Sequence, residues 1–244
     1  MKPCAFHEQE LTSHAKGSVD QMLTFFDDHY FTVLHRKLNH YLRKLGSNLD
    51  LDPQQVKELV KFLTAFHDIG KAAEEYQVQF DDACRAKGEK TSFVYHEVGG
   101  ALFLWYNRWE DEFLKVMSVM SVLNHLNAIR GLHNLNESKV KPGHLKLGRY
   151  GSAFLSQVID QTKVRNPFMT TYEVRDYEKY EVQDMVSQLS SFASSKLELK
   201  YYVLLLTPII VGDNLDSSSQ RKKDQSYKSK SRFITAIETE VKSS

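Results

Sequence analysis

Apolar residues recur along most of this chain at intervals of three and four positions, which is the spacing of one face of an α-helix. The clearest series runs over residues 19–45 and stops at Gly46. Glycine is common just past a helix end because it adopts the left-handed backbone conformation without strain. We therefore expect one long amphipathic helix over residues 19–45.

A second helix is predicted to begin after Asp52 and to run to Phe66. Aspartate is a strong N-cap, and Pro53 suits the first helical position. The same periodicity predicts five further helices, and the expected fold class is all-α. These helices are expected at residues 72–86, 96–109, 111–130, 177–193 and 196–216.

Two stretches lack the helical pattern. Residues 131–151 are rich in Gly, Asn, Lys and His, which is typical of a long loop. The polar, basic run from residue 217 is expected to be part of a mobile tail. The predicted organisation is therefore one domain over residues 1–216 and a basic tail over residues 217–244, which either belongs to the same domain or is mobile.

Composition limits the classes of function. With 32 Lys and Arg residues against 31 Asp and Glu residues, the formal charge is +1, so any phosphate binding must be local. The N-terminus lacks the apolar region of a signal peptide, and the apolar run 201–211 is too short to span a membrane. Cys4 and Cys84 form no CxxC pair, which argues against a disulfide framework or a zinc ribbon and favours a reducing cytoplasm.

The segment HDIGK, residues 67–71, comes at the end of the second predicted helix. Adjacent helical residues point about 100° apart, so His67 and Asp68 can converge only where the helix ends. Gly70 supplies such an end, and Lys71 is then close enough to hold an anionic oxygen. The alternative is that His67 and Asp68 cap one another at a helix terminus.

HDIGK resembles the signature of HD-domain metal-dependent phosphohydrolases. The order of motifs over nearly the whole chain is similar to that of the CRISPR-associated HD nucleases of type I interference systems. That order is a lone histidine, the HD pair, a histidine that opens the next helix, a histidine pair and a distal aspartate. The matching residues are His14, His67, Asp68, His96, His125 after Asn124, and Asp213.

The resemblance implies an HD-domain helical bundle that holds one or two divalent cations, Mg²⁺ or Mn²⁺, with Ni²⁺, Co²⁺, Fe²⁺ or Zn²⁺ as alternatives. A carboxylate has two oxygens that can face two cations, so Asp68 is expected to bridge them. His14, His67 and Asp213 would complete the first site, and His96 and His125 the second. Asp68 and Lys71 are the expected catalytic residues, with Lys71 balancing charge on the phosphate.

Several positions leave alternatives open. His7 competes with His14, and His96 can instead be a buried or capping histidine. Asp213 can instead cap a helix through its neighbours, although Pro208 is expected to kink or interrupt the helix and so aim Asp213 into the core.

The family pattern usually has two adjacent histidines where this chain has Asn124 and His125. If Asn124 takes the first position, its amide oxygen is a weaker ligand than imidazole. If His125 takes the first position, Leu126 takes the second and a ligand is lost. In both cases the occupancy of the second metal site is in question.

The resemblance also implies a nuclease that cuts single-stranded DNA, or RNA, internally or from an end. Lys141, Lys146 and Arg149 are candidate phosphate contacts, although a charged stretch is more often simply solvated. The resemblance implies a helicase partner and a crRNA-guided surveillance complex in the cytoplasm, with no membrane. Because the sequence contains no GxxxxGK[ST] motif, we expect that helicase to be a separate subunit. The alternatives are a phosphohydrolase of nucleotides and a non-catalytic adaptor with a decayed site.

Overall fold

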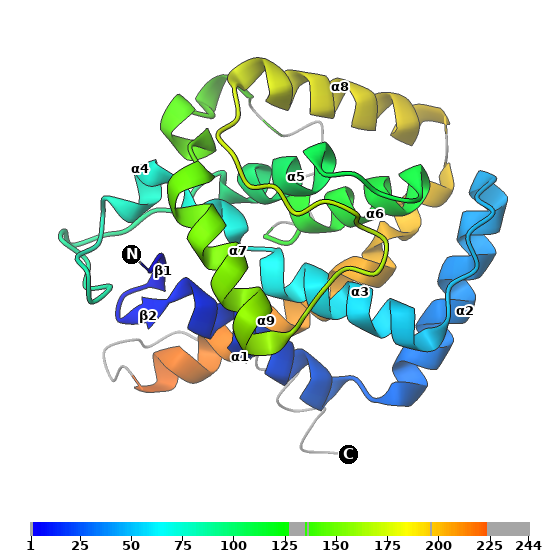
Figure 1. Ribbon diagram of the computed structural model, residues 1–244, viewed down its shortest axis with the longest axis horizontal. Helices are drawn as coiled ribbons and strands as arrows, with labels where there is room; N and C mark the ends of the chain where they lie inside the picture. Colours follow the sequence, from blue (N-terminus) through cyan, green and yellow to red (C-terminus); the bar gives the residue numbers. More distant parts are fainter. Residues whose placement is uncertain (1, 127–134, 136, 196, 224–244) are drawn as a thin grey trace.

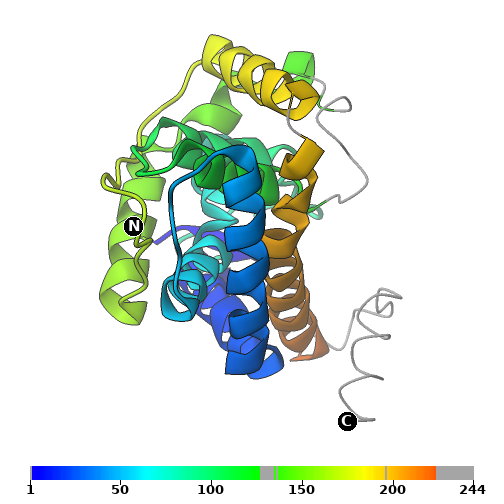
Figure 2. The ribbon, with the colours of Figure 1, turned by 90° about the vertical axis from the view of Figure 1, so that its right-hand side faces the viewer.

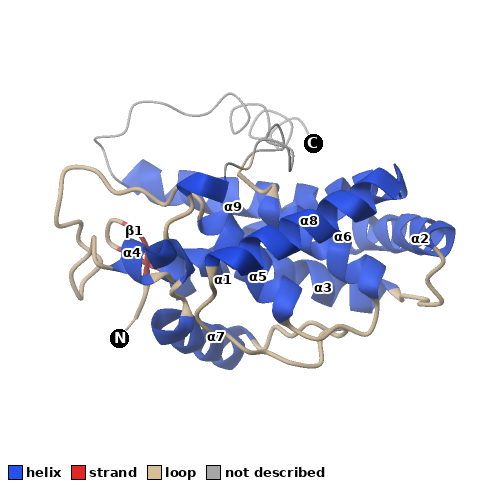
Figure 3. Ribbon diagram, turned by 90° about the horizontal axis from the view of Figure 1, so that it is seen from above, coloured by secondary structure: helices blue, strands red, loops and turns tan. Residues whose placement is uncertain are grey.

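The computed structural model describes residues 2–126, 135, 137–195 and 197–223. The described chain is a bundle of α-helices with one short antiparallel hairpin, so the all-α prediction is confirmed (Figures 1 and 3). The strands are β1 (Cys4–Phe6) and β2 (Gln9–Glu10). The helices are α1 (Leu11–Phe25), α2 (Asp28–Leu45), α3 (Pro53–Phe66), α4 (Glu74–Gln77), α5 (His96–Tyr106), α6 (Glu112–Leu123), α7 (Gly148–Thr162), α8 (Lys179–Ser195) and α9 (Val203–Lys223).

The expected helix over residues 19–45 is two helices, so that prediction is wrong. α1 ends at Phe25, and the Asp27 side chain accepts a hydrogen bond from the Tyr30 backbone N–H to begin α2. The hydrophobic periodicity continues through this break, because both helices turn their apolar faces to the same core. The predicted end is correct, since Gly46 caps α2 with a φ of 93°.

Other boundaries also differ from the sequence pattern. Residues 72–86 contain only the short helix α4, and α7 begins at Gly148, inside the expected loop. Pro208 lies inside α9 without ending it, and α9 extends through the first residues of the expected tail to Lys223. The remainder of that tail, residues 224–244, lies outside the described residues.

Three helices form the part of the core that surrounds the HD motif. α1 packs along α9, and α3 contacts both of them as well as α2 (Figures 1 and 2). α5 packs along α6 and against η1 (Ile69–Ala72), the short 3₁₀ helix that follows the HD pair. This arrangement brings the ends of α3 and α6, the start of α5 and the middle of α9 together. Among the described residues, no helix has the length and apolar character that a membrane span requires.

Cys4 and Cys84 form a disulfide, so the expectation from their spacing is wrong. They are 80 residues apart in sequence, but the turns after α4 return the chain to β1, and their Cα atoms lie 5.4 Å apart. The Gln77 side chain supports the same contact, because it accepts from the Cys4 N–H and donates to the Cys4 carbonyl. The cysteines therefore give no argument for a reducing compartment.

Replacing Cys84 with serine should lower the free energy of unfolding by about 2–4 kcal/mol, because a crosslink over a long separation restricts the unfolded chain. Guanidinium unfolding of Cys84→Ser beside the wild type measures this loss. Reductant should destabilise the wild type to the same extent and leave the Cys4→Ser, Cys84→Ser double variant unchanged. Two reactive thiols in denatured, unreduced wild type would contradict the crosslink.

Candidate metal centre

Four buried histidines have their Nδ1 atoms fixed by an oxygen acceptor. Three of them contact the backbone carbonyl three residues earlier, and the fourth, His14, contacts the Asp216 carboxylate. These acceptors cannot donate, so Nδ1 carries the hydrogen and Nε2 is left to face the interior. The Nδ1 contacts are His67 to Thr64 at 2.7 Å, His96 to Phe93 at 2.6 Å, His125 to Val122 at 2.6 Å and His14 to Asp216 Oδ2 at 2.7 Å.

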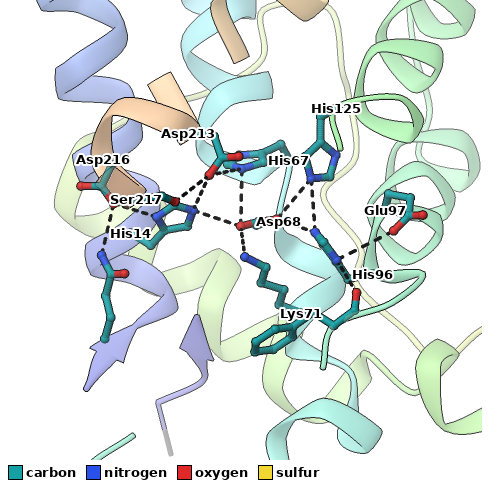
Figure 4. A network of polar contacts seen from close by, with 12 residues as sticks. His14, His67, Asp68, Lys71, His96, Glu97, His125, Asp213, Asp216 and Ser217 are labelled. Carbon is teal, nitrogen blue, oxygen red and sulfur yellow. Dashed lines mark hydrogen bonds and ion pairs between the residues drawn. The ribbon is translucent and has the colours of Figure 1, made fainter. Parts of the chain in front are cut away.

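Asp68 lies at the centre of these histidines, with its Oδ2 atom facing a first group (Figure 4). The Nε2 atoms of His14 and His67 lie 3.0 Å and 3.4 Å from this oxygen. Asp213 Oδ1 completes the group at 3.3 Å from His14 Nε2 and 3.7 Å from His67 Nε2. Two imidazole nitrogens and two carboxylate oxygens therefore converge on one point.

The Oδ1 atom of Asp68 faces a second group of two histidines (Figure 4). His96 Nε2 lies 2.8 Å from this oxygen, and His125 Nε2 lies 3.4 Å from it. The two Nε2 atoms lie 3.2 Å from each other. Asp68 thus presents one oxygen to each of two sets of ligand-type atoms.

The polar atoms of this centre are buried without adequate partners. Within the part of the chain that the structure describes, the Nε2 atoms of His14 and His67 and both oxygens of Asp68 have no hydrogen bond apart from the close ion-pair contacts that they make with one another and with Lys71 and the other histidines. Polar atoms left in this state are costly, and native proteins usually satisfy them with hydrogen bonds, water or ions. Imidazole nitrogens and carboxylate oxygens are common ligands of divalent transition metals. The donor set therefore fits one cation in each group, with Asp68 shared.

The electrostatics of the centre keep the carboxylates ionised. Burial opposes ionisation of Asp68, but the charges of His67, Lys71 and His96 hold its pKa well below the usual range. Burial also opposes protonation of His14, yet the surrounding carboxylates of Asp213, Asp216 and Asp68 raise its pKa to about 10. In the metal-free protein, His14 consequently holds a proton that a bound cation has to replace.

Two glycines bring the HD turn against the start of α5. A Cβ on Gly70 would lie 1.8 Å from the carbonyl oxygen of His96, and a Cβ on Gly100 would lie 2.9 Å from that of His67. Any side chain at these positions would push η1 and α5 apart. The glycines therefore set the distance between Asp68 and His96.

The comparisons with known proteins identify the family of this chain. The family model described as "Cas3, HD domain" matches residues 28–196. The chain belongs to this Cas3 HD-domain family. A relative, the CRISPR-associated endonuclease Cas3-HD of Saccharolobus solfataricus, is 36% identical over 254 aligned residues, which cover 99% of this chain and 97% of the relative.

A solved structure supports the HD-domain fold. The CRISPR-associated Cas3 HD domain protein of Methanocaldococcus jannaschii matches with a TM-score of 0.60 at 22% identity, over 86% of this chain and 99% of that chain. The resemblance to the CRISPR-associated HD family is thus confirmed, and so is the helical HD-domain fold.

In this Cas3 HD-domain chain, the six residues expected as ligands lie in the two groups that the family resemblance implied. They are His14, His67, Asp68 and Asp213 in the first group, and Asp68, His96 and His125 in the second. His7, the competitor of His14, is exposed, and its Nδ1 accepts a hydrogen bond from the Ala86 N–H. Asp213 lies within α9 rather than at a helix end, so its predicted alternative as a cap is wrong.

The position of Asn124 answers the question about the histidine pair. Asn124 is the C-cap residue of α6, and its Nδ2 donates to the Met120 carbonyl at 2.7 Å. His125 is the residue that faces Asp68, and Leu126 is 45% exposed. The second group therefore offers two nitrogens and one oxygen, whereas the first offers two of each.

Sequence reasoning missed three polar residues beside the centre. Asp216 accepts from His14 Nδ1 and from Gln9 Nε2, and Ser217 donates to Asp213 Oδ1 at 3.2 Å. Asp213 and Asp216 are three positions apart on α9, so they share one face of that helix. This spacing is a signal in the sequence that could have identified Asp216.

The three basic candidates for nucleic-acid binding lie near one another but have other partners. Lys141 Nζ pairs with Glu75 at 2.9 Å, and Lys146 Nζ pairs with Glu178 at 3.3 Å. The Arg149 guanidinium lies 5.2 Å from the centre of the Tyr150 ring. Their contact with phosphate remains a prediction.

We expect Mn²⁺ affinity to fall by about tenfold for each unit that the pH is lowered from 8 to 6, because the proton on His14 competes with the cation below its raised pKa. Calorimetric titrations in buffers of different ionisation enthalpy measure the affinity and the proton released. His14→Gln should reduce both the affinity and its pH dependence. Binding without proton release would contradict the protonated His14.

Proposed function

We propose that this chain is a metal-dependent nuclease that hydrolyses phosphodiester bonds of single-stranded DNA, with RNA as the alternative substrate, in CRISPR interference. The family membership supports a CRISPR-associated HD nuclease. The observation that carries the proposal is the Asp68 carboxylate, whose two oxygens face two separate groups of buried ligand atoms.

The first group of residues would hold one divalent cation, and the second group would hold another. Imidazole nitrogens together with carboxylate oxygens favour Mn²⁺ and neighbouring transition metals over Mg²⁺. When bound, such cations supply the Lewis acidity that polarises a phosphodiester and activates water. The second group has fewer ligand atoms, so we expect it to bind its cation less tightly.

Lys71 would act on the phosphate. Its ammonium lies 2.6 Å from Asp68 Oδ2 and 4.2 Å from the centre of the Phe6 ring, and the residue is buried. A fixed positive charge in a buried site stabilises developing negative charge strongly, because it is poorly screened by water. Lys71 would thus bind an anionic oxygen of the phosphodiester beside the metal ligands.

The substrate would approach over the surface that carries Lys141, Lys146 and Arg149. Exposed ion pairs are worth at most about 1 kcal/mol, so a nucleic-acid phosphate can displace Glu75 or Glu178 from these lysines. A separate helicase subunit would expose the single strands. A crRNA-guided surveillance complex in the cytoplasm would direct that subunit to its target.

Asp68→Ala should abolish cleavage, because this change removes the carboxylate that both groups share. A labelled single-stranded oligonucleotide with Mn²⁺ measures cleavage, and thermal unfolding checks that the variant is folded. Asp20→Ala, which removes an exposed carboxylate of α1, is the matched control and should cut as the wild type does. Cleavage by Asp68→Ala at the wild-type rate would remove the mechanism.

The same assay should include RNA, duplex DNA and deoxynucleoside triphosphates. Preference for single-stranded DNA or RNA supports the nuclease. Hydrolysis of triphosphates without cleavage of oligonucleotides would replace the proposal by a nucleotide phosphohydrolase. Tight Mn²⁺ binding without any hydrolysis would favour an adaptor.

Lys71→Met should separate chemistry from metal binding. Loss of one fixed charge at the phosphate is expected to slow single-turnover cleavage by about 100-fold or more. Mn²⁺ affinity should be retained or increased, because Asp68 Oδ2 loses a competing cation. Cleavage at the normal rate would show that Lys71 serves only to neutralise Asp68.

A further inference from the structure

The imidazole of His14 is held between two carboxylates of α9 (Figure 4). Asp213 Oδ1 lies 3.3 Å from Nε2, on the side of the metal centre. Asp216 Oδ2 lies 2.7 Å from Nδ1, on the opposite side of the ring. Asp216 is 4% exposed and belongs to neither group of ligand atoms. Its carboxylate therefore acts on the centre through His14.

Glycines at the contact between α1 and α9 make this approach possible. A Cβ on Gly17 would lie 2.0 Å from Asp216 Oδ1, and a Cβ on Gly212 would lie 2.5 Å from the Ser18 carbonyl oxygen. At Gly17 the backbone of α1 therefore touches the Asp216 side chain, and at Gly212 the backbone of α9 touches the backbone of α1. A side chain at position 17 would displace the Asp216 carboxylate from His14.

Asp216 differs from the acceptors of the other site histidines. His67, His96 and His125 each donate to a neutral carbonyl within their own segment. His14 donates to a charged carboxylate from the other end of the chain, and Gln9 Nε2 donates to the same oxygen at 3.2 Å. A carboxylate acceptor makes the opposite ring nitrogen a stronger metal ligand than a carbonyl does. A buried charge is also expensive when it serves packing alone.

We infer that Asp216 is a positioning residue that fixes His14 with Nε2 toward the first group and makes that group the tighter cation site. This inference rests on the metal centre of the proposed function. It attributes the difference in cation affinity between the two sites to α9, which supplies both Asp213 and Asp216. The probe that tests it is Mn²⁺ alone.

Asp216→Ala should weaken Mn²⁺ binding at the tighter site by about 10–100-fold and leave the weaker site unchanged. Calorimetric titration measures both affinities. Asp216→Asn keeps an oxygen acceptor of the same size but loses the charge, so it should restore the affinity only in part. An unchanged affinity in Asp216→Ala would overturn the inference.

Nuclear magnetic resonance of histidine-labelled, metal-free protein reads the positioning directly. The hydrogen on His14 Nδ1 should give an exchange-protected signal, identified by its loss in His14→Gln. Asp216→Ala should remove this signal, while the corresponding signals of His67, His96 and His125 persist and show that the core is folded. Persistence of the His14 signal in Asp216→Ala would overturn the inference.

Two further variants separate positioning from packing. Gln9→Ala removes the other partner of Asp216 and should leave the His14 signal and the tighter site in place. A full loss in Gln9→Ala would show that Asp216 serves to join β2 to α9, which overturns the inference. Gly17→Ala should reproduce Asp216→Ala by displacing the carboxylate, and it provides the test if Asp216→Ala does not fold.

The wild-type titration distinguishes this inference from the proposed function. A wild-type chain without Mn²⁺ binding overturns the proposed metal centre. The His14 signal then decides by itself whether Asp216 orients the ring. If the wild type binds Mn²⁺ normally and Asp216→Ala changes neither the affinity nor the His14 signal, the proposed function stands and only the inference is overturned.

Discussion

The burial of Asp68 is the constraint on which the rest of this structure depends. An ionised carboxylate at 2% exposure is unfavourable unless positive charge and polar groups surround it. The chain supplies that charge through Lys71 and through histidines from four different helices or their ends. The interior of the bundle therefore contains a polar centre, and the apolar faces of the helices pack around it.

Backbone contact, rather than side-chain packing, sets the distances at the centre. Gly70 and Gly100 let η1 and α5 approach, and Gly17 and Gly212 do the same for α1 and α9. The first pair lies beside Asp68 and His96, and the second pair lies beside His14 and Asp213. Because a Cβ would clash in every case, the positions of the ligands depend on these glycines as much as on the histidines. A protein interior tolerates little change of this kind, since it is close-packed.

The sequence could predict the fold class and the grouping of the six ligand-type residues, because HDIGK and the later histidines follow a recognisable order. It could not show the break between α1 and α2, since Phe26 and Tyr30 keep the apolar period through it. The contact of Cys4 with Cys84 depends on how the turns after α4 fold back, and spacing does not record this. Asp216 was missed because the motif pattern ends at Asp213.

The difference between the two groups follows from how each is anchored. The histidines of the second group lie at the beginning of α5 and just after α6, and each donates to a carbonyl of its own segment. The first group joins the N-terminal α1 to the C-terminal α9, so it forms only when the two ends of the domain have packed. Binding of a cation there would stabilise that long-range contact, because a ligand that binds only the folded state shifts the equilibrium toward it. Cation binding would therefore be coupled through His14 to the packing of α1 against α9.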